Sequence, residues 1–148
     1  MTKPHKNAGL RLLATTKLAD ADIALIAKEA AEAAAVKAPQ WSTIRLEKAE
    51  QGFLVFSVRG PGGLVEQMEF ALEAVTEDGP TKMQSTITRY KQSQSTFAGF
   101  IPTGQKKMSG LSAYRKWIKN FTTALQEADP SAQIDVNGPL TSSVGEWI

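Results

Sequence analysis

Residues 111–128 read LSAYRKWIKNFTTALQEA, and this stretch decides the fold because it predicts one long amphipathic helix. Its apolar residues recur at alternating steps of three and four positions, which is the spacing of a single helix face: Leu111, Tyr114, Ile118, Phe121, Leu125 and Ala128. Trp117 widens that face, and Ser109 is its predicted N-cap. The pair Asp129-Pro130 predicts the end, because proline disfavours helical geometry in the residue before it. Large aromatic side chains on one face require a second layer, so the rest of the chain should supply a sheet.

The preceding residues predict that sheet, because their apolar positions change to a period of two. Strands are predicted over five ranges: 10–18, 42–49, 53–59, 64–76 and 82–94. A helix rich in alanine is predicted over 21–37, with Asp20 or Asp22 as its cap. Residues 95–108 are predicted to form a connection to the closing helix.

Turn chemistry between the strands predicts their register. A two-residue turn centred between Pro61 and Gly62 would set Phe53 opposite Phe70. The three predicted hairpins together place one apolar set on the face toward the helices: Leu46, Phe53, Val55, Met68, Phe70, Leu72, Met83 and Ile87. A smaller apolar patch of Leu54, Phe56 and Val58 would then lie on the opposite face, where it is covered by the chain's own ends or contacts a second copy.

The predicted fold class is α+β: an antiparallel sheet of about five or more strands, with the alanine-rich helix and the long C-terminal helix packed on one face. Residues 10–130 form the expected single domain. Residues 1–9 are expected to be a flexible N-terminus, and residues 131–148 a loose tail.

Composition argues against several kinds of site. The chain has no cysteine, so disulfides, thiolate nucleophiles and zinc–thiolate centres are not expected. His5 is the only histidine and lies in the predicted tail, which argues against a serine–histidine triad or a histidine metal site. No metal and no cofactor is expected. The net charge of +2 makes a nucleic-acid partner unlikely, and no run of residues is apolar enough for a membrane span or a secretion signal. A cytoplasmic location is therefore expected.

Three short motifs carry a resemblance to a known superfamily: TITRY at 86–90, FIPTG at 100–104, and Gly110 followed by Tyr114 at the start of the last helix. With the element order, they make residues 10–129 resemble the helix-grip fold of START-like proteins, the SRPBCC superfamily, and its small actinobacterial members in particular. The resemblance implies an apolar ligand held between the sheet and the C-terminal helix, and some members are cyclases, aromatases or hydratases. This chain lacks the second short helix of the usual plan.

The sequence therefore leaves three functions open. A START-like protein that binds an apolar or amphipathic small molecule would use these residues: Met68, Phe70, Met83, Ile87, Tyr114, Trp117, Ile118 and Phe121. A non-enzymatic interaction module, such as a homodimer, would use Leu54, Phe56 and Val58. An enzyme of the cyclase or hydratase type would use Glu66, Arg89 and Tyr90, because the alternation places Glu66 and Arg89 on the helix-facing side of the sheet. The structural alternative for that pair is a salt bridge at the rim of the sheet.

Overall fold

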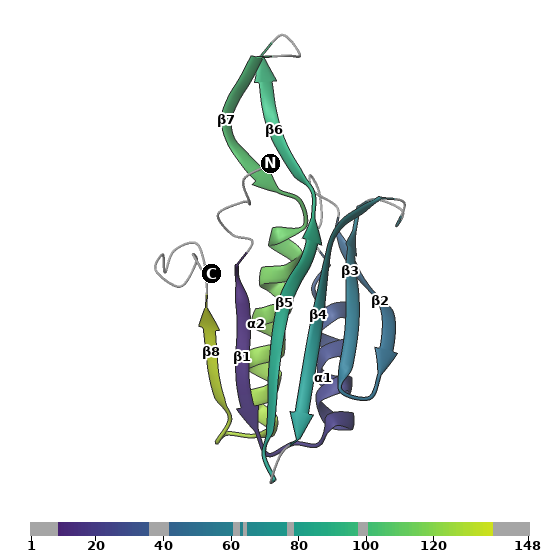
Figure 1. Cartoon of the computed structure of the whole chain (residues 1–148), viewed down its shortest axis with the longest axis vertical. Coiled ribbons are helices and arrows are strands. Elements are labelled where there is room, and N and C mark those ends of the chain that lie inside the picture. The colour runs from purple at the N-terminus through teal and green to yellow at the C-terminus, as the bar shows by residue number, and fades with distance from the viewer. Residues whose placement is uncertain are drawn as a thin grey trace.

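The computed structural model describes residues 9–35, 42–60, 63, 65–76, 79–97 and 101–137, and for residues 92–97, 101–108 and 137 it describes the backbone alone. It confirms the α+β class, with two helices on one face of an antiparallel sheet (Figure 1). Two described elements are helices: α1 (Asp20–Glu32) and α2 (Leu111–Ala128). In the described part of the chain, no helix is both long and apolar enough to cross a membrane.

Six strands form the main sheet in the order β2-β3-β4-β5-β1-β8, and every neighbouring pair is antiparallel. Their bounds are β1 (Arg11–Thr16), β2 (Thr43–Glu50), β3 (Phe53–Arg59), β4 (Glu66–Thr76), β5 (Thr81–Tyr90) and β8 (Gln133–Asn137). The first strand thus lies between β5 and β8, and both helices lie behind the sheet in Figure 1.

The sequence missed three strands. The predicted connection at 95–108 is instead part of a hairpin, β6 (Gln92–Phe97) with β7 (Ile101–Met108), which continues beyond the end of the sheet (Figure 1). The expectation of a loose tail is wrong for residues 133–137, which form β8 and pair with β1. The expected flexibility of the first residues and of the last eleven concerns positions outside the described part of the chain.

Both helices occupy their predicted places but begin differently from the prediction. Helix α2 spans the predicted residues, and its N-cap is Gly110 rather than Ser109. Helix α1 follows Ala19 without a side-chain cap, and its last helical residue is Glu32, before the predicted end at 37. Residues 36–40 lie outside the described part of the chain.

The registers of the two central hairpins decide which residues face the helices. The prediction for β4 and β5 is confirmed over most of its length, with Phe70 opposite Ile87. The prediction for β3 and β4 is wrong, because Phe56 rather than Phe53 lies opposite Phe70. The Gly60 N–H donates to the Val65 carbonyl at 2.9 Å, so the connection is wider than a two-residue turn. The observed register differs from the predicted one by an odd number of residues. A shift of this kind places every side chain of β3 on the face opposite to the predicted one.

A buried carboxylate joins the end of α2 to the end of β1. Asp129 accepts a hydrogen bond from the Ser131 hydroxyl at 2.6 Å, one from the Thr16 hydroxyl at 2.6 Å and one from the Lys17 N–H at 2.9 Å. These bonds hold the pKa of Asp129 well below its ordinary value, because each favours the charged form. The bond from the Ser131 hydroxyl has the largest effect. The link sets where the chain turns from α2 into β8.

Gly110 fixes how closely the start of α2 approaches the sheet. Its φ of 85° lies in the left-handed region. A Cβ at this position would lie 3.0 Å from Met68 Cβ and 3.1 Å from Val58 Cγ1, so a side chain would fit only if the neighbouring side chains of β3 and β4 moved by a few tenths of an ångström.

We expect Gly110→Ala to destabilise the fold more than Gly63→Ala does. Gly63 has a similar φ of 72° and would meet no atom within 4 Å, so its substitution costs only backbone strain of about 1–2 kcal/mol. Gly110→Ala adds a steric cost of about 1–3 kcal/mol. Urea unfolding of both variants measures the difference, and equal losses would show that the close approach of α2 does not depend on this glycine.

Candidate functional site

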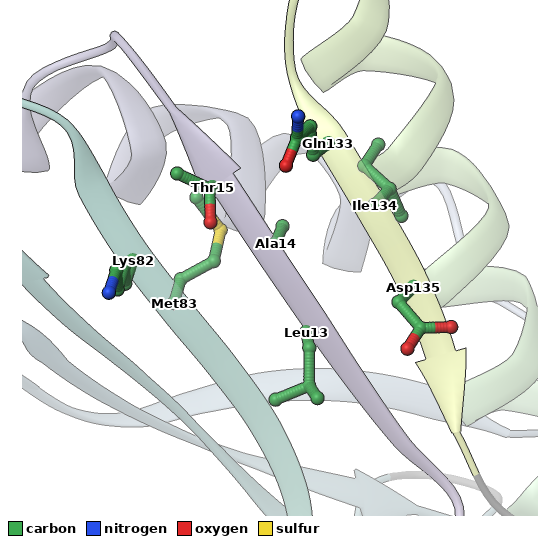
Figure 2. Close-up of a pocket in the computed structure, with 8 residues that line it drawn as sticks. All are labelled: Leu13, Ala14, Thr15, Lys82, Met83, Gln133, Ile134 and Asp135. Atoms are coloured by element: carbon green, nitrogen blue, oxygen red, sulfur yellow. The ribbon is translucent and has the colours of Figure 1, made fainter.

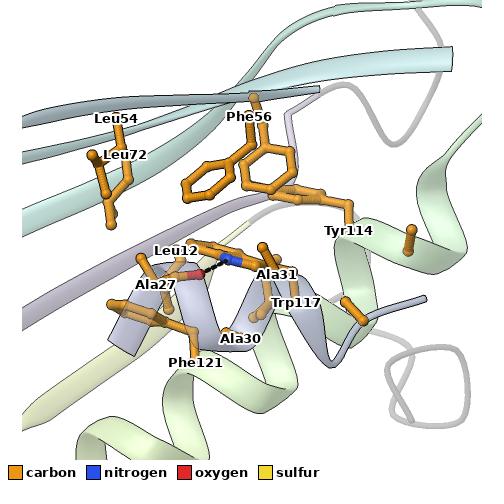
Figure 3. Packing of buried hydrophobic residues seen from close by; sticks show 14 of the residues in the cluster. Leu12, Ala27, Ala30, Ala31, Leu54, Phe56, Leu72, Tyr114, Trp117 and Phe121 are labelled. Atoms are coloured by element: carbon orange, nitrogen blue, oxygen red, sulfur yellow. Dashed lines mark hydrogen bonds between the residues drawn. The ribbon is translucent and has the colours of Figure 1, made fainter. Parts of the chain in front are cut away.

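Aromatic rings fill the space between the sheet and α2, which is where a ligand was predicted to bind. The ring centroid of Trp117 lies 4.9 Å from that of Phe70 and 5.0 Å from that of Phe121. Phe70 also contacts Tyr114 at 4.6 Å and Phe56 at 5.2 Å. All five side chains are completely buried. Figure 3 shows Phe56, Tyr114, Trp117 and Phe121 of this group. Their edges and faces contact one another in the arrangements that stabilise aromatic clusters.

The residues predicted to hold a ligand belong to this core. Seven are buried and Ile87 is partly buried: Met68, Phe70, Met83, Tyr114, Trp117, Ile118 and Phe121 are the buried ones. They come from β4, β5 and α2, as predicted, so the structure does bring them together. They pack against each other and against α1, as an ordinary hydrophobic core does.

One polar pair lies within this apolar core. The hydroxyl oxygens of Tyr114 and Ser85 are 2.9 Å apart, and either can donate. Burial raises the pKa of Tyr114 well above its ordinary value, because the phenolate would be desolvated, and the bond with Ser85 offsets only part of this effect. The phenol therefore stays neutral, and the bond satisfies both hydroxyls inside the core.

The patch predicted as an interface is also part of the core. Leu54 is 5% exposed, and Phe56 and Val58 are completely buried against the helices. The reversed face of β3 explains this error: Phe53 and Val55, which were predicted to be buried, lie on the helix-free face instead. A dimer contact through Leu54, Phe56 and Val58 is therefore incompatible with the fold.

Two β-bulges place Glu66 and Arg89 together on the helix-free face. In β5 the pairing changes from Phe70–Ile87 to Glu69–Arg89, which leaves Thr88 as an extra residue. In β4 the pairing changes in the same way at Gln67. Each bulge reverses the alternation beyond it, so both side chains leave the helix-facing side that regular alternation predicted for them.

The pair forms a three-residue ion cluster with Glu69. Arg89 Nε donates to Glu66 Oε2 at 2.8 Å, and Nη2 donates to Glu66 Oε1 at 3.0 Å and to Glu69 Oε2 at 2.7 Å. The hydrogen bond with Glu66, followed by the charge of Glu69, raises the pKa of Arg89 above its ordinary value. The Arg89 side chain is nevertheless 64% exposed, whereas those of Glu66 and Glu69 are 25% and 22% exposed.

The structure does not bring Tyr90 to this cluster. Tyr90 lies opposite Met68 and packs against the core, on the other face of the sheet from Arg89. The three residues proposed for catalysis are therefore split between two faces, and both carboxylate oxygens of Glu66 accept bonds from Arg89.

A second ion cluster on the same face was not predicted as a site. Glu47 Oε1 accepts hydrogen bonds from the Ser57 hydroxyl at 2.6 Å, from Arg45 Nε at 2.9 Å and from Arg59 Nη2 at 3.0 Å. These bonds lower the pKa of Glu47 to about 2. The bond from Ser57 has the largest effect, and the bond from Arg45 has the next largest. The sequence did show opposite charges on neighbouring strands, which could have indicated this cluster. The same pattern is found on any solvent-exposed face of a sheet, so it did not identify a site.

A shallow groove of about 280 Å³ crosses β5, β1 and β8 (Figure 2). Lys82 borders it on β5, Leu13 and Thr15 lie on β1, and Gln133 and Asp135 border it on β8. A second hollow of about 20 Å³, between α1 and the ends of β3 and β4, is about large enough for one water molecule. Neither hollow lies between α2 and the centre of the sheet. Among the described residues, no three acidic or histidine side chains gather as metal ligands would.

Comparisons with known proteins found no matching family model, no similar curated protein and no similar solved structure. The resemblance to START-like proteins therefore stays a prediction. The α+β architecture with a long C-terminal helix on the sheet agrees with it at the level of the fold.

We expect Phe70→Ala to open the filled space and to create a binding cavity for small apolar molecules. Loss of the ring should destabilise the protein by about 3–5 kcal/mol, and the dry cavity should bind benzene, which the parent protein should not bind there. Val75→Ala is the matched control, because Val75 lies on the same strand and is 53% exposed. Calorimetric unfolding with and without benzene measures both effects. Equal stabilisation of the parent by benzene would show that the space is already open.

Proposed function

We propose that this domain is a non-enzymatic interaction module that binds a protein partner on the helix-free face of its sheet. The observation that carries the proposal is the state of Arg89: three hydrogen bonds to two carboxylates hold its guanidinium, and the side chain remains 64% exposed. Arginine is enriched among the residues that dominate the energy of protein interfaces.

The three bonds fix the orientation of the guanidinium and leave donors for a partner. They use the N–H of Nε and both N–H groups of Nη2. No bond from Nη1 to another described residue is seen, so its two N–H groups can donate to an acceptor on the partner. Because Glu66 and Glu69 already restrict the side chain, binding costs less conformational entropy than it would for a mobile arginine.

A second exposed arginine on the same row suggests the spacing of the partner's acceptors. Arg45 lies opposite Ser57, Ser57 opposite Glu69, and Glu69 opposite Arg89. Three strand spacings separate the two arginines, which is about 14 Å. Arg45 is 57% exposed. We therefore expect the partner to present two carboxylates or other oxygen acceptors at about this separation.

The filled core favours this function over the two others. A small molecule between the sheet and α2 would have to displace a ring from a cluster whose members are completely buried. An enzyme using Glu66, Arg89 and Tyr90 would have to act across both faces of the sheet. The interaction module requires no rearrangement, because its exposed groups are already in place.

The test places a photo-crosslinking amino acid at Thr86, a partly exposed position on the helix-free face of β5. In extract from the native host, we expect one discrete crosslinked protein. Arg89→Ala should lower its yield by about tenfold or more, and Arg89→Lys should restore only part of it, because lysine cannot reproduce the guanidinium fork.

Lys119→Ala is the control, because it removes the same charge from an exposed position on α2. Unfolding midpoints of all variants should show that the fold is kept. An unchanged yield in Arg89→Ala, or an equal loss in Lys119→Ala, would contradict the proposed face.

A further inference from the structure

The main sheet has two edge strands, which differ in the features that prevent pairing with a further strand. These edges are β2 and β8, which lie on opposite sides of the sheet in Figure 1. An edge strand presents backbone N–H and C=O groups on its outer side, and proteins commonly block such edges with charges, proline or bulges.

Two such features, a bulge and exposed charges, are present in β2. Its register shifts between Leu46 and Lys48, which is a bulge at Glu47. Half of its eight residues are charged and exposed: Arg45, Glu47, Lys48 and Glu50. Added strands are therefore disfavoured at this edge by both shape and charge.

The β8 edge carries neither a bulge nor a run of charges. Gln133–Asn137 pair with β1 in five consecutive, unshifted positions, and the segment contains no lysine and no proline. Asp135 is its one charged residue. Of the strands that the structure describes, β1 alone pairs with β8. Ile134 and Val136 are only partly buried at this end of the core, so a further strand with its own apolar residues would extend the covered surface.

We propose that the occupant of this edge is β8 of a second copy, so that two antiparallel β8 strands join two sheets into one. A two-fold axis makes such a contact self-complementary. Cross-strand partners must share a face, which restricts the pairing to registers in which a residue lies opposite its own copy.

The charge of Asp135 disfavours one of these registers. A register centred on Asp135 sets two carboxylates against each other, which is unfavourable. The register centred on Ile134 sets Ile134 against its copy on the helix-facing side, and Gln133 opposite Asp135 of the second copy on the other side. An amide can donate to a carboxylate, so this register pairs apolar with apolar and donor with acceptor.

The full-length chain is tested by sedimentation velocity over about 10 μM to 1 mM, because a contact of one short strand is smaller than a standard interface and should be weak. We expect a monomer–dimer equilibrium within this range. Gln133→Glu sets like charges opposite each other twice in the symmetric dimer, and Gln133→Lys sets opposite charges there twice. The dissociation constant should rise about 2- to 30-fold in the first variant and fall by a similar factor in the second.

Gln126→Glu and Gln126→Lys are the matched controls, because Gln126 is an exposed glutamine on α2 and the net charge changes equally. They should leave the dissociation constant unchanged. A monomer at every concentration would overturn the proposal. So would a dimer that responds to neither Gln133 variant, or one that responds equally to the Gln126 variants. Loss of self-association in Arg89→Ala alone would assign it to the sheet face instead of the β8 edge.

Discussion

The position of the Trp117 indole is the constraint on which the rest of the structure depends. Its ring contacts those of Phe70 and Phe121. Its Nε1–H donates to the Ala27 carbonyl of α1 at 3.0 Å (Figure 3). A buried indole N–H needs an acceptor, and a backbone carbonyl inside a helix can be reached only if the helix comes close. Alanines at 27, 30, 31 and 34 allow that approach. One side chain therefore fixes the sheet, α2 and α1 together.

This packing determines where the protein can bind another molecule. Helix α1 packs closely against α2, and the aromatic rings fill the space between α2 and the sheet. The described part of the core therefore serves to stabilise the fold. Two clusters of hydrogen-bonded charged side chains, around Glu47 and around Arg89, lie on the other face of the sheet. Bulges at Thr88 and Gln67 create the cluster around Arg89, since bulges commonly change the direction of side chains.

The sequence predicted the features that depend on strong local periodicity. Helix α2 has the predicted ends, and the register of β4 with β5 follows from a tight turn. The face of β3 was mispredicted because residues 53–56 read FLVF, in which both alternating sets are apolar. The face then depended on the width of the turn after Arg59, which residue types alone did not define. Alternation also does not reveal bulges, so the sequence predicted that Glu66 lies near Arg89 but placed the pair on the wrong side of the sheet. Strand β8 has only two apolar residues in alternation, Ile134 and Val136, and its pairing with β1 spans most of the chain.

Buried aromatic side chains fill the space between the centre of the sheet and α2. Native mass spectrometry of the protein purified from its own host, compared with a denatured sample, tests it most directly. If the space is filled, the native and denatured masses of each protomer should agree, with no small molecule retained. A retained apolar molecule released only on denaturation, and lost in Trp117→Phe, would contradict the account and would favour a ligand carrier.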